Sequence, residues 1–576
     1  MRLRISENKN GTKNLYVLKS YRTDNGKSTT KIVEKLGNYE ELSKIHEDPI
    51  AWAKEYVEEL NRKEQEKNME VTVNFKPSEQ IEKDEQHLYE GGYLFLQKIY
   101  YELRLDYICK KISEKYRFTY NINEILSRLI YARILSPSSK LSTFEYSSKL
   151  IENRSFELQD IYRALDVIAE ESEFIQSNMY KFSKNISKRN DKILYYDCTN
   201  YYFELEEERG MAKYGISKEN RPNPIIEMGL FMDGDGIPLA FCLNDGNTNE
   251  QKTMIPLERQ IIDDFGNSKF IVCTDAGLSS IENRRFNNTS DKAFITTQSI
   301  KKMKDFQKEW ALSPDGWHLT GETKLFNLNE IEEKSDEYYN RIFYKEQWFN
   351  ENGIEQRYIV TYSLKYLNYT RKIRAEQIAR AKKTIENKSD RVRQTDYKRF
   401  ISKTAVTPNG EIAEKNMYFL NQEKISEEER YDGFYAVATN LEDEPEAIIS
   451  VNKGRWEIEE SFKIMKSEFQ ARPVYLQKDN RILAHFTTCF IALTIFRYIE
   501  KRLQHKYTCS QIIDNLNDIK FLKLQDEGYL PAYTRNDFTD DLHRTFGFRT
   551  DFQILSKASM RKIISDSKKS HKILHS

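Results

Sequence analysis

The chain has 576 residues, too many for one hydrophobic core, so several domains are expected. Hydrophobic residues make up 39% of it, which is enough to build cores and excludes global disorder. Its 90 basic and 90 acidic residues balance to a net charge of zero, so any DNA binding would depend on local basic patches.

Neither secretion nor membrane insertion is indicated. The six cysteines form no pair or cluster with zinc spacing, and the first residues contain no apolar signal segment. The most apolar stretch, residues 482–495, is too short to span a bilayer. It contains His485, which we expect to be a core histidine with its hydrogen bonds satisfied. The sequence therefore predicts a cytoplasmic protein without a membrane partner.

The N-terminal residues, 1–75, read as a small domain. Residues 15–18 and 29–33 are strand-like and flank a polar turn at 24–26, which predicts a hairpin. Residues 52–61 have helical periodicity.

The next region, residues 85–188, reads as mainly helical, with apolar residues at helical spacing and a break at Pro137. Strands follow. Residues 193–196 form an apolar run that ends in Asp197, and residues 270–274 form another that ends in Asp275. Between these runs, the segment 225–243 reads as two strands joined by an Asp-Gly-Asp-Gly turn.

The region after residue 285 is less regular, with strand-like runs and a basic helix at 371–388. This basic segment, which continues to Arg393, is either a solvated face or a phosphate-binding surface. A strand pattern returns at 433–439. Residues 448–469 read as one long helix, and 482–503 as a second, apolar one.

Two strand ends carry candidate chemistry. The ends of strands open onto the crevice of an α/β sheet, where ligands usually bind. Asp197 and Asp275 both occupy such positions, and carboxylate oxygens are the ligands that Mg²⁺ and Mn²⁺ prefer. Aspartate is also common at turns, so neither residue alone indicates a site.

A third element has a more specific pattern. On the helix predicted at 448–469, Arg455, Glu459 and Lys466 share one face, and Asn452 joins the same stripe. The stripe could place a carboxylate on a metal and two cations on phosphates. The alternative is a solvated face with salt bridges between turns.

This pattern resembles a known family. Arg455, Glu459 and Lys466 have the Arg-x3-Glu-x6-Lys spacing of insertion-sequence transposases of the IS-four superfamily, the group with the Tyr-Arg-Glu-Lys signature. Asp275-Ala-Gly-Leu resembles the family's second aspartate motif, and Tyr-Asp197-Cys-Thr resembles its first. The signature tyrosine falls at Asn452, a side chain that can also hydrogen-bond phosphate.

The resemblance implies an α/β fold: an RNase H-like catalytic core with a β-rich insertion domain, plus a helical N-terminal region. It implies that Asp197, Asp275 and Glu459 hold Mg²⁺ or Mn²⁺, as two ions, and that Arg455, Lys466 and Asn452 contact DNA. The domains expected are 1–75 (possible binding of DNA ends), 85–188 (helical), 190–284 (first part of the core), 285–435 (insertion), 436–505 (second part of the core with the catalytic helix) and 506–576 (helical, with a basic tail).

The function that the resemblance implies is a DNA transposase that cleaves transposon ends and transfers strands into target DNA. Its partners would be transposon-end DNA and target DNA, which a homodimer would bind on the nucleoid. Two alternatives remain open: a metal-dependent nuclease on the same fold, and a DNA-binding protein derived from a transposase.

Overall fold

The computed structural model describes residues 1–7, 11–22, 28–46, 48–67, 77–78, 80–81, 83–386, 396–406, 412–524 and 527–570. The chain forms two compact units. The first comprises residues 1–85 with 524–527, and the second comprises 86–523 with 528–576.

The first unit is a three-stranded antiparallel sheet with two helices. Its elements are β1 (Arg2–Glu7), β2 (Lys13–Arg22), β3 (Ser28–Asn38), α1 (Tyr39–Leu42) and α2 (Pro49–Lys67). β2 and β3 pair antiparallel with Leu18 opposite Ile32, which confirms the predicted hairpin, while its turn at 24–26 lies outside the described residues. Leu15, Leu42 and Ala53 form a small buried core.

The second unit contains a helical part built from both ends of its sequence. Its elements are β4 (Leu88–Glu90), α3 (Tyr93–Glu102), α4 (Leu105–Lys115), α5 (Ile122–Leu135), α6 (Lys140–Ser148), α7 (Leu158–Glu170), α8 (Ser172–Ser183), α16 (Asp479–Arg502), α17 (Cys509–Asp518), β16 (Lys520–Leu524), β17 (Gly528–Pro531), α18 (Asp537–Phe546) and α19 (Lys557–Ser567). One continuous apolar core joins these helices. The region predicted as helical is helical.

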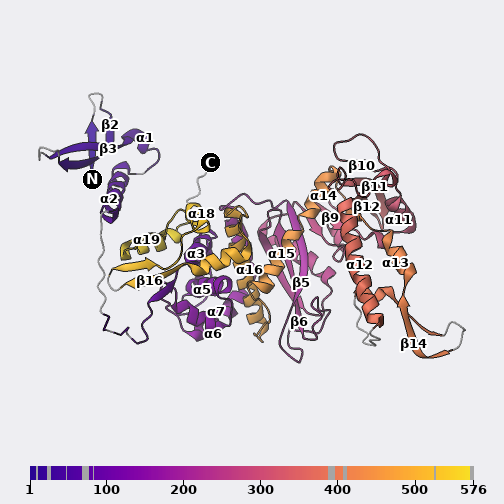
Figure 1. Ribbon diagram of the computed structural model, residues 1–576. Helices are drawn as coiled ribbons and strands as arrows, with labels where there is room; N and C mark the ends of the chain where they lie inside the picture. The colour runs from indigo at the N-terminus through magenta and orange to yellow at the C-terminus, as the bar shows by residue number, and fades with distance from the viewer. Residues whose placement is uncertain are drawn as a thin grey trace. The chain divides into compact units, whose positions relative to one another are not determined.

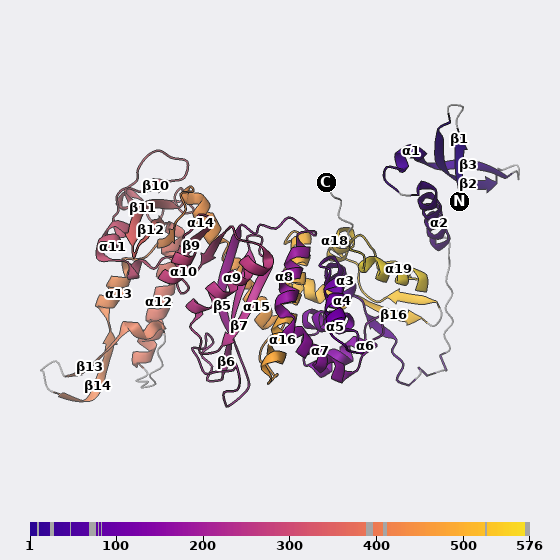
Figure 2. The ribbon, with the colours of Figure 1, turned by 180° about the vertical axis from the view of Figure 1, so that it is seen from behind.

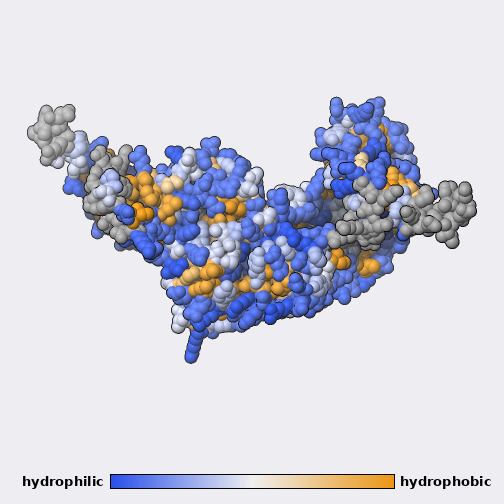
Figure 3. Space-filling model, turned by 60° about the horizontal axis from the view of Figure 1, so that its bottom comes forward, coloured by the Kyte–Doolittle hydropathy of each residue, from blue (hydrophilic) through white to orange (hydrophobic). Residues whose placement is uncertain are grey.

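The α16 helix is the central element of this core. It is longer than the apolar stretch seen in the sequence and could cross a membrane by length and composition, yet 94% of its apolar window is buried inside the protein. Its apolarity is thus explained by packing against α3, α5 and α7. The face of the molecule seen in Figure 3 is mainly hydrophilic, with separate apolar areas. His485 of α16 is buried, and its Nε2 lies 3.1 Å from the Ala471 carbonyl, as expected for a core histidine.

A nine-stranded sheet forms the middle of the second unit. Its order is β10-β11-β12-β15-β9-β8-β5-β6-β7. β5, β8 and β9 run parallel, and every other neighbouring pair is antiparallel. The strands are β5 (Ile193–Tyr202), β6 (Ile225–Asp233), β7 (Pro238–Asp245), β8 (Phe270–Thr274), β9 (Lys292–Thr297), β10 (His318–Leu319), β11 (Phe343–Glu351), β12 (Ile354–Tyr362) and β15 (Phe434–Thr439).

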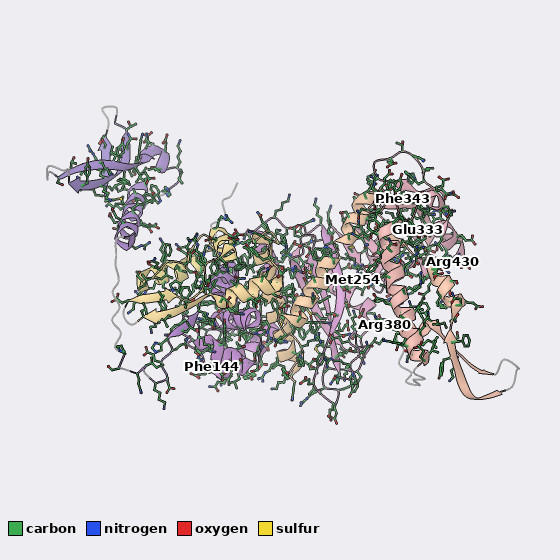
Figure 4. The ribbon with its side chains drawn as sticks, viewed as in Figure 1. Phe144, Met254, Glu333, Phe343, Arg380 and Arg430 are labelled. Atoms are coloured by element: carbon green, nitrogen blue, oxygen red, sulfur yellow. The ribbon has the colours of Figure 1, made fainter. Side chains whose placement is uncertain are left out.

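Helices cover both faces of this sheet at β5. Successive side chains of this strand point to opposite sides and pack against different helices. Tyr196 and Cys198 pack toward α9 (Met254–Phe265), whereas Tyr195 packs toward α14 (Pro445–Lys453). Figure 1 shows α15 (Trp456–Ser467) beside β5, and the reverse view in Figure 2 shows α9 on the other side. Met254, labelled in Figure 4, begins α9.

The segment between β9 and β15 supplies strands to the same sheet and further elements beside it. Its remaining helices and strands are α11 (Asp305–Leu312), α12 (Leu364–Glu386), β13 (Ile401–Val406), β14 (Ile412–Leu420) and α13 (Gln422–Glu429), and α10 (Ile281–Phe286) precedes β9. Residues 371–386 of the basic helix expected at 371–388 belong to α12, where Arg371 pairs with Glu333 and Arg374 with Asp432, and residues 387–388 lie outside the described residues. Arg391 and Arg393 lie outside the described residues.

The prediction of a single long helix at 448–469 is wrong, because the structure has two helices there, α14 and α15. The Tyr195 hydroxyl donates a hydrogen bond to the Val451 carbonyl over 3.0 Å, so the Arg455 amide bonds to Asn452 instead. Only glycine fits next to this hydroxyl: a Cβ on Gly454 would lie 2.2 Å from it. Asn452 therefore belongs to a different helix from Glu459 and Lys466.

Candidate active site

Two of the predicted carboxylates come from neighbouring parallel strands. Asp197 lies in β5 and Asp275 directly follows β8, and the pairing of Tyr195 with Cys273 sets both at corresponding positions two residues farther on. Asp197 Oδ1 accepts a hydrogen bond from the Cys198 amide over 2.8 Å, and Asp275 Oδ1 accepts one from the Leu278 amide over 2.9 Å. The structure therefore brings Asp197 and Asp275 together.

The electrostatics of Asp197 depend on this neighbourhood. Burial raises its pKa to about 6, Lys218 lowers the pKa, and the nearby Asp275 raises it. A bound cation would stabilise a partly buried carboxylate beside a second carboxylate.

Glu459 lies in the first turn of α15, where its side chain is 65% exposed and 3.7 Å from Arg455. Within the described parts of the chain, no group of three or more His, Cys, Asp or Glu side chains is arranged to hold a metal ion. The structure therefore places Glu459 in an ion pair with Arg455 rather than in a three-carboxylate cluster.

Arg455 connects the start of α15 to the sheet. Its Nη1 donates a hydrogen bond to the Thr297 hydroxyl at the end of β9 over 3.1 Å, and its charge lowers the pKa of Asp197. Arg455 is thus close to Glu459, as the prediction of a shared helix face requires, and its charge also acts on Asp197.

Asn452 is 6% exposed, and both ends of its amide are engaged. Its Nδ2 donates to the Tyr435 hydroxyl over 2.9 Å, and its Oδ1 lies 3.7 Å from Cys273 Sγ. The Tyr435 hydroxyl is in turn 2.6 Å from the Thr297 hydroxyl that receives Arg455. The Asn452 side chain is therefore linked to the Arg455 guanidinium through Tyr435 and Thr297.

Lys466, near the end of α15, lies on the same side of β5 as Asp197. Its Nζ donates to the Thr199 hydroxyl over 2.7 Å and lies 3.4 Å from Glu219 Oε1. Burial lowers the pKa of Lys466, while Glu219 raises it.

Several charged residues near the site were not found from sequence, because they lie in a loop or a strand without a motif. Lys218, in the loop after β5, lies 2.8 Å from Glu250. The buried Glu227 of β6 has a pKa raised to about 8 by burial and by Glu250. Glu250 thus lies beside Lys218, the ammonium that also lowers the pKa of Asp197.

The donor atoms present fit a hard divalent cation. Asp197, in the middle of β5, and Asp275, directly after β8, supply carboxylate oxygens at corresponding positions of adjacent strands, and burial is the main cause of the raised pKa of Asp197. Glu459 has an exposed carboxylate on the helix that packs on β5. Carboxylate oxygens from two neighbouring strands suit metal-assisted phosphoryl chemistry.

Comparison with known proteins identifies the class. A sequence model of the transposase DDE domain matches residues 203–495, half of the chain, so the chain belongs to the DDE transposase family. Residues 3–72 match the N-terminal domain of IS1634 family transposases, so it is an insertion-sequence transposase. The DDE match contains Asp275 and Glu459 and begins after Asp197.

The other comparisons add little. A solved piggyBac transposase synaptic complex with hairpin DNA is similar at a TM-score of 0.35 and 9% identity, over 84% of this chain and 85% of that one. No curated protein matches the chain significantly.

Proposed function

We propose that this DNA transposase cleaves transposon ends and joins the resulting 3′-hydroxyl to target DNA, with two Mg²⁺ or Mn²⁺ ions held by Asp197, Asp275 and Glu459. The observation that carries the proposal is the pairing of β5 with β8, which sets two carboxylates side by side under the helix that carries Glu459. When bound, the ions would activate the attacking oxygen and stabilise the leaving one.

The sheet supports an RNase H-like core. The order β7-β6-β5-β8-β9, with β5, β8 and β9 parallel, forms one compact half of the sheet and carries both aspartates. In this proposal, residues 190–284 and 436–505 supply the core and 285–435 an insertion whose strands β10, β11 and β12 extend the sheet. Residues 1–75 would then bind transposon ends.

The side chains around the carboxylates have defined tasks in this proposal. Glu459 would exchange its pairing with Arg455 for the metal, and this exchange releases Arg455 to bind a DNA phosphate. Lys466, held by Thr199, neutralises another phosphate. Asn452 positions Arg455 through Tyr435 and Thr297. These roles would place the chain in the group of the IS-four superfamily with the Tyr-Arg-Glu-Lys signature.

A strand-transfer assay tests the proposal. Terminal inverted repeats in the DNA that flanks the gene would supply the end sequence. Purified protein, Mg²⁺, a labelled end with a free 3′-hydroxyl and a supercoiled target should give covalently joined products. Cleavage without joining would instead indicate a nuclease, and binding without either reaction would indicate a DNA-binding derivative. Cross-linking on end DNA would show whether a homodimer forms.

A further inference from the structure

We propose that Lys466 and Arg472 together form a phosphate-binding subsite for DNA, and that Glu219 occupies this subsite as an internal substitute for a phosphate in the DNA-free protein. The inference rests on the proposed function, because it concerns how the same site receives its substrate. It adds Arg472 to the DNA-binding residues and gives Glu219 a competing role.

The Glu219 carboxylate bridges Lys466 and Arg472, and its Oε2 also lies 3.8 Å from Arg221 Nε. Arg472 Nη1 donates a hydrogen bond to Glu219 Oε2, and Lys466 Nζ lies 3.4 Å from Glu219 Oε1. Glu219 belongs to the loop between β5 and β6, whereas Lys466 and Arg472 lie at the end of α15 and just after it. A phosphate has the same kind of anionic oxygens, and guanidinium and ammonium groups bind either anion.

The pair of cations is partly buried and requires an anion. The side chains of Lys466, Glu219 and Arg472 are 15%, 23% and 25% exposed. Burial lowers the pKa of Lys466, and the positive charge of Arg472 lowers it further. Arg472 Nε is buried and has no hydrogen-bond partner within the described part of the chain, so Glu219 leaves the guanidinium incompletely satisfied.

The loop that delivers Glu219 is anchored to β5. The Asn200 side chain, 2% exposed, donates to the Ile216 carbonyl over 3.0 Å and accepts from the Lys218 amide over 3.2 Å. Lys218 Nζ then binds the Cys198 carbonyl and Glu250. These contacts fix residues 216–219, so Glu219 is directed at Lys466 and Arg472.

The subsite adjoins the candidate carboxylates. Lys466 is held by Thr199, two residues after Asp197 on the same face of β5, which corresponds to a spacing of about 7 Å along the strand. A phosphate at this position would belong to the strand being cut. DNA must displace Glu219 to reach Lys466 and Arg472, so the internal contact lowers the apparent affinity for DNA.

The experiment measures the affinity of the full chain for a fluorescent duplex by anisotropy, over a range of salt concentrations. Glu219→Gln removes the competing charge and should bind DNA about fivefold more tightly than wild type. Arg472→Ala should bind more weakly, with a salt slope smaller by about one unit. In the double variant the gain from Glu219→Gln should largely disappear. Glu207→Gln, an exposed residue of the same loop, is the matched control and should bind like wild type.

A second measurement separates a loss of folding from a loss of binding. Glu219→Gln removes the carboxylate that Lys466, Arg472 and Arg221 share, so its Tm should fall in the absence of DNA and recover when duplex is added. Millimolar inorganic phosphate should raise the Tm of Glu219→Gln less than duplex does; equal effects would assign the subsite to free phosphate and overturn the proposal.

The outcomes distinguish this inference from the proposed function. If wild-type protein cleaves and joins DNA while Glu219→Gln and Arg472→Ala bind like wild type, the subsite is refuted and the transposase proposal stands. If Glu219→Gln binds DNA more tightly but no variant joins DNA, the subsite stands and strand transfer is refuted.

Discussion

The Lys466 ammonium donates a hydrogen bond to the Thr199 hydroxyl over 2.7 Å. Because Thr199 and Asp197 share one face of β5, this bond fixes the lysine beside the first candidate carboxylate. The contact places the Lys466 end of the charged helix face predicted from the sequence next to β5.

Lys466→Ala should therefore weaken binding to transposon-end DNA by about tenfold at low salt. The loss should shrink as salt rises, since one phosphate contact contributes about one unit of salt slope. Metal affinity should not change. Lys463→Ala, an exposed lysine of the same helix, is the control. If Lys466→Ala binds DNA and transfers strands like wild type, the charged face of Arg455, Glu459 and Lys466 is only a solvated helix face.

Asp197→Asn, Asp275→Asn and Glu459→Gln should each reduce Mg²⁺-dependent cleavage by at least about a hundredfold while DNA binding persists. Each change removes a charge that holds metal and keeps the shape of the side chain. Asp264→Asn, on the exposed end of α9, should cleave like wild type. Cleavage that persists in one of the three variants removes that residue from the triad. The result for Glu459 is the most informative, because its carboxylate is paired with Arg455.

Tyr435→Phe should slow cleavage by about fivefold and lower the Tm by about 2 °C. The change leaves the Asn452 amide without its acceptor and removes the hydroxyl next to Thr297, which holds Arg455. Affinity for DNA should fall less than the rate of cleavage, because Lys466 is unaffected. Tyr431→Phe is the matched control, since its hydroxyl makes no hydrogen bond to the residues that the structure describes. Equal cleavage rates in both variants would contradict the proposal that Asn452 positions Arg455 through Tyr435 and Thr297.

Glu258→Gln should stabilise the protein in a pH-dependent way. Glu258 of α9 is fully buried, and burial raises its pKa from 4.5 to about 8. The wild-type carboxyl keeps its proton in the folded state but loses it in the unfolded state between these two pH values, so its contribution to stability is lost as pH rises. The variant should gain up to about 4 kcal/mol at pH 8 and nothing near pH 4.

Thermal unfolding of wild type and Glu258→Gln across this pH range measures the effect. The Asn287 amide can still donate to the Gln oxygen, as it does to Glu258 Oε1 over 3.0 Å. Glu282→Gln, exposed on α10, should show no such trend. A difference in Tm that stays constant with pH would show that Glu258 is ionised in the folded protein.

A short apolar run followed by a polar residue correctly predicted a strand end at Asp275. The same pattern at Asp197 was wrong about the strand end, because β5 continues to Tyr202 and Asp197 lies in its middle. The spacing of Arg455, Glu459 and Lys466 depends only on helical geometry. The break at Gly454 could not be predicted this way: a single glycine is tolerated in a helix, and the cause of the break is the hydroxyl of Tyr195, distant in sequence.

The loop carrying Lys218 and Glu219 shows a different limit. It has no periodicity, and its importance depends on contacts with Asn200, Lys466 and Arg472 that only the folded chain creates. The sequence also could not predict that β11 and β12 join the central sheet, because local periodicity does not show which distant segments pair as strands.

The position of β15 between β9 and β12 affects how the chain is made. Both neighbours leave the ribosome well before β15, so each exposes an unpaired edge until residues 434–439 are synthesised. At roughly 5–20 residues per second, the wait after β9 lasts on the order of ten seconds. During this interval the nascent chain is a substrate for chaperones and is prone to aggregation. A transcript truncated before β15 would yield a protein in which β12 and β9 lack the strand that joins them.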